Sequence, residues 1–125
     1  MIRRRSALLR WSLASLVVAS VVAGGSALAA ERVRAAGERW RPAHTYIGVG
    51  ERVVWRNPTE RRHDVTAYGG GWSLSRTLRP GDRASFVFDE VRDGGRPYLY
   101  RCVIHSAIVD GRCVGMCGKV HVFTG

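Results

Sequence analysis

Four side chains in the C-terminal two thirds of this 125-residue sequence could together bind a metal ion. Cys102 and His105 are separated by two residues, Met116 follows after a further ten, and His63 lies about forty residues upstream. Two imidazoles, one thiolate and one thioether are the ligand set of a blue-copper electron-transfer site, in which a distant axial sulfur tunes the potential. The sequence therefore predicts one copper ion bound by His63, Cys102, His105 and Met116.

A second metal site can be drawn from the same region. Cys102, His105, Cys113 and Cys117 have a spacing that suits a tetrahedral structural zinc site. This set leaves the upstream histidine and the methionine unused, and it requires three thiolates. Each predicted copper ligand also has an ordinary structural interpretation, as a surface histidine, a buried thiol or a methionine that fills the core. One free thiol in the metal-free protein would favour copper, and three would favour zinc.

The first 29 residues have the three parts of an export signal. Arg3, Arg4, Arg5 and Arg10 form a basic start without acidic residues, an apolar run follows, and the segment ends in small residues at Ala29. This order is typical of a secretory signal peptide cleaved after its small residues. The alternative is an uncleaved membrane anchor. We therefore expect an exported protein, located in the periplasm, the cell envelope or outside the cell.

The charge of the remaining chain is moderately basic. The sequence has 20 Lys and Arg residues and 10 acidic residues, and four of the arginines lie before residue 30, so residues 30–125 carry a net charge of +6. The basic residues are not gathered on a predicted helix, and the sequence has no zinc-finger spacing of cysteines and histidines. Nucleic-acid binding is therefore not indicated. A basic surface favours a partner protein with an acidic docking surface. The sequence contains no Ser-His-Asp or paired-carboxylate arrangement that would indicate an enzyme.

The pattern of residues 30–125 predicts a single all-β domain. Proline and glycine interrupt it at short intervals, and the runs between them are too short for stable helices. Apolar residues alternate within these runs, as in the pairs Val53 and Trp55, or Val120 and Val122. Alternation of period two with frequent turns is typical of a β-sandwich or barrel. Residues 31–41 have few apolar positions, and we expect them to form a loose N-terminal strand or tail.

Taken together, these features resemble the cupredoxins of the plastocyanin/azurin type over essentially all of residues 30–125. The resemblance includes an Asn57-x5-His63 element, the Cys102-x2-His105 element, and a closing Met116-x-Gly118 strand. Residues 41–57 are similar to the first β-hairpin of that family, and residues 78–88 to its middle hairpin. The resemblance implies a Greek-key β-sandwich, one type 1 copper, and a monomeric one-electron carrier. A copper-delivery or copper-resistance protein of the same fold is the alternative function.

The sequence departs from the family between His105 and Met116, where ten residues replace a shorter loop. Cys113 lies in this insertion and Cys117 directly follows Met116. Cysteines tend to pair in an oxidising compartment. With Cys102 taken as the thiolate ligand, the remaining two are predicted to form a Cys113–Cys117 disulfide that braces the long ligand loop.

Three further expectations concern residues around the site. Asn57 is expected either to brace the ligand loops by hydrogen bonds or to serve as a simple turn residue. His121 falls on the polar face of its strand and should be exposed to solvent, and His44 has no predicted partner. The edge of His105, with the neighbouring apolar Ile108 and Val109, is the expected port for electrons, as the resemblance implies.

Overall fold

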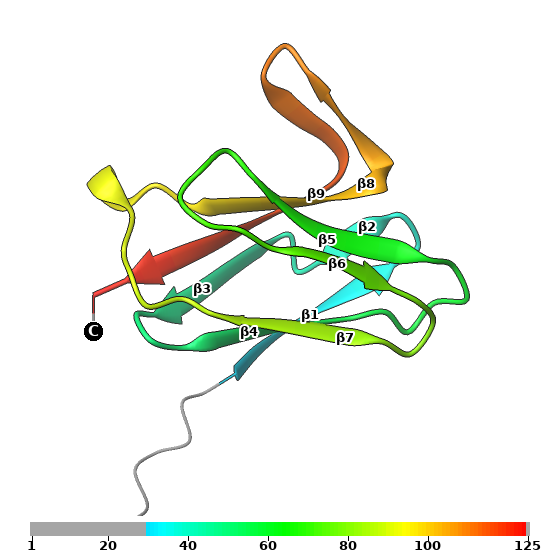
Figure 1. Cartoon of the computed structure of the whole chain (residues 1–125), viewed down its shortest axis with the longest axis horizontal. Coiled ribbons are helices and arrows are strands. Elements are labelled where there is room, and N and C mark those ends of the chain that lie inside the picture. The colour runs from blue at the N-terminus through cyan, green and yellow to red at the C-terminus, as the bar shows by residue number, and fades with distance from the viewer. Residues whose placement is uncertain (1–29, 125) are drawn as a thin grey trace, which may run out of the picture.

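The computed structural model describes residues 30–124, and the predicted signal segment lies outside them. These residues form nine strands and one short 3₁₀ turn, η1 (Asp93–Gly95), arranged as two sheets that face each other (Figure 1). The strands are β1 (Ala30–Ala36), β2 (Arg39–Arg41), β3 (His44–Gly48), β4 (Arg52–Arg56), β5 (His63–Tyr68), β6 (Ser75–Leu78), β7 (Arg83–Val87), β8 (Tyr98–Val109) and β9 (Arg112–Phe123). The predicted all-β sandwich is confirmed.

The chain passes repeatedly from one sheet to the other. One sheet has the order β2-β1-β4-β7, and the other has the order β3-β9-β8-β5-β6. The pairs β1–β4 and β3–β9 are parallel, and the remaining pairs are antiparallel. Within residues 30–124, no helix is long and apolar enough to cross a membrane.

Alternating side chains from both sheets fill the space between them. Trp55 and Tyr100 are fully buried, and their rings meet edge to face with centroids 5.2 Å apart. Phe88 packs against Trp55 from the same side of the core. Aromatic pairs in this geometry contribute attraction beyond the burial of their area. The predicted inward faces are confirmed, and they give the sandwich a rigid aromatic centre.

Residues 31–41 form strands, as one of the two predicted possibilities allowed, but they are neither loose nor a tail. This segment forms β1 and β2, and β1 lies inside its sheet, paired with β4 on one side and β2 on the other. Val33, Ala35 and Trp40 are buried. In β1 the buried Val33 and Ala35 alternate with more exposed residues. The strand therefore contributes to the core although its overall apolar content is low.

The two hairpins suggested by the family resemblance are also not present as paired strands. β3 and β4 lie in different sheets, and so do β6 and β7. Each short connection therefore turns the chain from one sheet to the other. Alternation identifies which residues face inward, but it contains no information about which strand is the neighbour.

The ten-residue insertion extends the hairpin formed by β8 and β9. Its residues pair as a two-stranded ribbon, from Ser106 opposite Gly115 to Val109 opposite Arg112. The ribbon projects from the end of the sandwich (Figure 1). Asp110 and Gly111 form its two-residue turn, and both have positive φ angles, as tight hairpin turns require. The predicted Cys113–Cys117 disulfide is present, with its Cα atoms 6.1 Å apart.

Candidate metal centre

An irregularity in the pairing of β8 with β9 builds the candidate site. Regular pairing stops at Arg101 opposite Cys117 and resumes at Ser106 opposite Gly115. Four residues of β8, 102–105, therefore stand opposite the single residue Met116 of β9. A bulge of this kind bends the strand and redirects its side chains. The insertion thus begins and ends beside the site and leaves residues 105 and 116 near each other.

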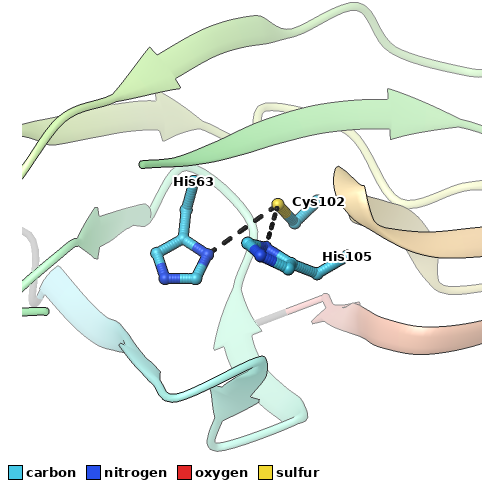
Figure 2. A group of neighbouring side chains, drawn as sticks. All are labelled: His63, Cys102 and His105. Atoms are coloured by element: carbon cyan, nitrogen blue, oxygen red, sulfur yellow. Dashed lines mark hydrogen bonds between the residues drawn. The ribbon is translucent and has the colours of Figure 1, made fainter. Parts of the chain in front are cut away.

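Three predicted ligands converge within this region. His63, the first residue of β5, and Cys102 are fully buried, and His105 is partly buried. The Cys102 sulfur lies 3.5 Å from Nδ1 of His105 and 3.9 Å from Nδ1 of His63 (Figure 2). One donor atom from each residue lies within 4.8 Å of the other two. His105 lies inside the bulge of β8.

These separations suit a single metal ion. Thiolate and imidazole ligands bind first-row metal ions at about 2.3 Å and about 2.0–2.1 Å, respectively. A trigonal arrangement with these bond lengths sets each sulfur–nitrogen distance at about 3.8 Å. The observed distances of 3.5 and 3.9 Å bracket that value. The two rings and the sulfur could therefore hold an ion with only small side-chain movements.

Met116 is fully buried in β9. It stands opposite the bulge that contains Cys102 and His105, and it lies between the two cysteines of the disulfide. This backbone placement suits the predicted fourth ligand. The assignment of its thioether to the metal remains a prediction.

A chain of hydrogen bonds fixes the His63 ring. Its Nε2 lies 3.1 Å from the Thr59 hydroxyl, which in turn donates to the side-chain oxygen of Asn57 at 2.6 Å. Asn57 is fully buried and donates from its amide to the backbone oxygens of Arg61 and Leu78. The bracing role considered for Asn57 is therefore confirmed. Such outer contacts orient metal-binding histidines and set which ring nitrogen is free.

The far side of the His105 ring faces a carboxylate. Its Nε2 lies 3.7 Å from Glu38, and Glu38 also forms an ion pair of 2.9 Å with Arg61. The His105 side chain is only 14% exposed. Sequence analysis missed Glu38 because it lies in the turn between β1 and β2, within the segment interpreted as a tail. The apolar Val33 and Ala35 two residues apart, followed by Trp40, were the signal that could have placed that turn near the core.

Asp64 holds the backbone around Cys102. Its carboxylate accepts hydrogen bonds from the backbone N–H groups of Val103 and Ile104 and from the Thr66 hydroxyl. The Cys102 thiol also donates to it at 3.3 Å, and the Asp64 N–H donates to the same sulfur at 3.4 Å. One residue thus ties the ligand strand β8 to β5 and places a negative charge beside the sulfur.

The environment sets the protonation states of these groups. Burial raises the pKa of the Cys102 thiol, so it carries its proton in the metal-free chain, and a metal ion must displace that proton. Burial also lowers the pKa of His63, and the neighbouring His105 lowers it further. Burial alone would raise the pKa of Asp64, but the hydrogen bonds from the Thr66 hydroxyl and the Val103 N–H outweigh it, so the pKa is lowered. At neutral pH His63 is therefore neutral and offers a lone pair to a metal.

The lowered pKa of His63 predicts how the metal-free protein responds to acid. Below pH 6.5 the unfolded chain protonates this histidine while the folded chain resists it, so the free energy of unfolding should fall as pH drops from 7 towards 5. The pKa of His121 is lowered too and adds to the same effect. Urea unfolding at several pH values measures the slope. A His63→Gln variant should show a shallower slope, and an unchanged slope would contradict the assignment.

The disulfide decides against the zinc alternative. Cys113 and Cys117 are bonded to each other, and Cys102 is the one free cysteine of the chain. The proposed zinc set would need all three as thiolates. His63, which that set leaves unused, lies beside Cys102, whereas the two bonded cysteines have no thiolate to offer.

Comparisons with known proteins agree with this geometry. No protein-family model and no curated protein matches the chain. A reduced proline-to-phenylalanine mutant of amicyanin is similar, with a TM-score of 0.61 and 23% identity over 75% of this chain and 82% of that chain. A purple cupredoxin from Nitrosopumilus maritimus aligns with a TM-score of 0.56 and 22% identity, covering 74% of this chain and 99% of its own.

A larger protein contains a similar unit. The copper-containing nitrite reductase from Thermus scotoductus SA-01 aligns with a TM-score of 0.61 and 22% identity over 78% of this chain, but over only 23% of that chain. At these identities the likeness establishes the fold. The chain has the cupredoxin β-sandwich, and three of the predicted ligands converge at the bulge of β8.

Proposed function

We propose that this chain, which has the cupredoxin fold, is a blue (type 1) copper protein that carries single electrons. His63 and His105 would bind the copper through Nδ1 and Cys102 through its sulfur, with Met116 as the weaker fourth ligand. The observation that carries this proposal is the convergence of the three donor atoms within 4.8 Å, at separations suited to one ion. The ligand types and their expected geometry are those of blue-copper sites.

Copper bound here would supply a one-electron Cu(II)/Cu(I) couple. The residues of the chain contribute a fixed ligand geometry. Asn57 and Thr59 hold His63, Asp64 holds the backbone of residues 103–104, and the disulfide anchors the segment around Met116. A site that moves little between oxidation states loses little energy to reorganisation during electron transfer. This fixed geometry supports a carrier function, because all four predicted ligand positions come from the protein itself.

A partner protein would approach near His105. Ile108 and Val109 on the ribbon are exposed, which suits an apolar contact next to this ligand. Residues 30–125 are basic, and Arg61 is well exposed beside Glu38. We propose a redox partner with an acidic docking surface. Because salt screens such attraction, stopped-flow rates with that partner should fall as ionic strength rises, and rates that rise would contradict the proposal.

The N-terminal segment supports a function outside the cytoplasm. Residues 1–29 have the order of an export signal, and a disulfide is stable in an oxidising compartment. We propose that the protein acts after export, as residues 30–125. N-terminal sequencing of the protein from a cell-envelope fraction tests the cleavage site, and a retained residue 1 would contradict it.

Voltammetry of the copper-loaded protein tests the carrier function. We expect a reversible one-electron couple and rapid electron self-exchange, measured by NMR line broadening in mixtures of the two oxidation states. The copper should stay bound when a metal-free copper acceptor is added, because two of its ligands are fully buried. Slow self-exchange together with rapid copper transfer to the acceptor would favour the delivery function instead.

Replacing Asp64 by asparagine should raise the reduction potential. A carboxylate beside the Cys102 sulfur stabilises the more positive Cu(II) state, and the amide removes that charge. Its one oxygen can still accept from the Val103 N–H, but the weaker hydrogen bond from Ile104, which goes to the other carboxylate oxygen, is lost. We expect an increase on the order of 50 mV, measured by voltammetry. Asp110→Asn removes the same charge at the ribbon turn and should leave the potential nearly unchanged. An unchanged or lower potential in Asp64→Asn would contradict the electrostatic role.

A further inference from the structure

Two histidines outside the candidate copper site meet on the outer face of the five-stranded sheet. His44 is the first residue of β3, which forms an edge of that sheet, and His121 lies in the neighbouring β9. Nδ1 of His44 lies 3.0 Å from Nε2 of His121. Their Cα positions are diagonal neighbours, because His44 pairs with Lys119 and Tyr46 pairs with His121. Sequence analysis found no partner for His44, and the structure supplies one.

The His121 ring is held in place by its neighbours. Tyr46 stacks on the His121 ring, with centroids 4.5 Å apart and planes 10° apart, and Phe123 continues the row beyond Tyr46. The two imidazole planes differ by only 15°. His121 is half-buried by these contacts, whereas His44 is exposed. A ring fixed in this way loses little freedom when it binds a ligand.

The surroundings of His121 favour its neutral form but also oppose a cation. Partial burial lowers the pKa of His121, and His44 and Lys119 lower it further. At neutral pH His121 therefore presents the neutral imidazole that metal ions require. Lys119 carries a positive charge next to the pair and weakens the binding of any cation. Removing this charge is thus a direct way to detect an ion between the two rings.

The distance between the nitrogens is close to the spacing of two ligands on one ion. Because the ring centroids are 5.3 Å apart, the two rings meet head on, and the exposed His44 side chain must shift for both lone pairs to reach that ion. An ion bound at about 2.0–2.1 Å from each would separate them by about 2.9 Å at a right angle and by about 3.3 Å at a tetrahedral angle. The observed 3.0 Å lies between these values. We propose that His44 and His121 form a second, surface metal site that takes one divalent transition-metal ion, with Cu²⁺ bound most tightly and water completing its coordination.

This site is separate from the first in both position and chemistry. His121 lies five residues beyond Met116 along β9, and its side chain faces outward while Val120 and Val122 face the core. The site contains no sulfur ligand, so bound Cu²⁺ would be tetragonal and lack the intense blue band. The inference does not rest on the proposed electron-carrier function.

Titration of the copper-loaded protein with further Cu²⁺ tests the site. Equilibrium dialysis should detect a second copper, and EPR should show a second signal with the wide hyperfine splitting of tetragonal nitrogen and oxygen ligands. His44→Ala and His121→Ala should each lose that signal and keep the first copper. Failure to bind a second ion at millimolar Cu²⁺, or equal binding by both alanine variants, would show that the pair is only a hydrogen bond and overturn the proposal.

Two further variants separate this site from the first and from general charge effects. Cys102→Ser should still bind Cu²⁺ at the histidine pair even if it has no blue site. Lys119→Gln should bind the second Cu²⁺ several-fold more tightly, whereas Arg83→Gln, which removes a charge from β7 of the four-stranded sheet, should bind it nearly as the parent does. Equal tightening in both charge variants would contradict the placement of the ion beside Lys119.

Discussion

Replacing Cys102 by serine is expected to remove the blue colour of the copper-loaded protein completely. The intense band of a blue-copper site arises from the thiolate–copper bond, and Cys102 is the one free cysteine of the chain. The substitution exchanges a sulfur for a smaller oxygen within the core, so the fold should persist with a moderate loss of stability. Optical absorption with one equivalent of Cu²⁺ measures the colour, and circular dichroism confirms that the variant is folded.

The matched control removes the sulfur atoms of the other two cysteines. With both Cys113 and Cys117 replaced by serine, the protein should keep its blue colour, because neither sulfur is free to bind copper. Its free energy of unfolding should fall by about 2 kcal/mol, the entropic contribution expected for so short a loop. A colourless double variant would show that Cys113 or Cys117 is needed for the blue site, and it would contradict the assignment to Cys102 alone. A blue Cys102→Ser variant would do the same.

Replacing Gly115 by alanine is expected to damage both the fold and the candidate site. Gly115 has a φ of +105°, which side-chain-bearing residues rarely adopt, and an added Cβ would collide with the backbone oxygen of His105. The colliding atom belongs to the bulge that carries the ligands, so relief requires movement of His105 or Met116. We expect a loss of about 3 kcal/mol or more in the free energy of unfolding, measured by urea denaturation.

Gly111→Ala serves as the control for the effect of backbone angle alone. Gly111 also has a positive φ, at +75°, but an added Cβ there would meet no atom within 4 Å. It should cost about 1–2 kcal/mol and leave the copper spectrum unchanged. Gly115→Ala should in addition alter the copper spectrum. Equal losses and identical spectra in the two variants would show that the approach of Gly115 to His105 does not shape the site.

The sequence allowed prediction of the site ligands better than of their surroundings. Cys102, His105 and His63 were identified because each residue type has few other reasons to occur at that spacing. Thr59 and Glu38 were missed because a hydroxyl or a carboxylate on the surface is common, and only the fold brings them to Nε2 of a histidine. The contact between His44 and His121 was missed for the same reason, since it depends on β3 pairing in parallel with β9.

The fold class was predictable, but the strand neighbours were not. Alternation correctly placed residues such as Trp55 and Tyr100 in the core. It failed for β1, where Val33 and Ala35 are buried between charged residues in a sequence of low apolar content. It also could not show that the ten inserted residues pair with each other. That pairing, from Ser106 opposite Gly115 outward, is what leaves His105 and Met116 near each other.

X-ray absorption at the copper edge of the copper-loaded protein tests the central claim most directly. The claim is that one sulfur and two imidazole nitrogens, from Cys102, His63 and His105, surround a single ion. The account predicts one short copper–sulfur bond and two copper–nitrogen bonds typical of imidazole. A copper ion surrounded only by nitrogen and oxygen would contradict it, because the Cys102 sulfur would then take no part in binding.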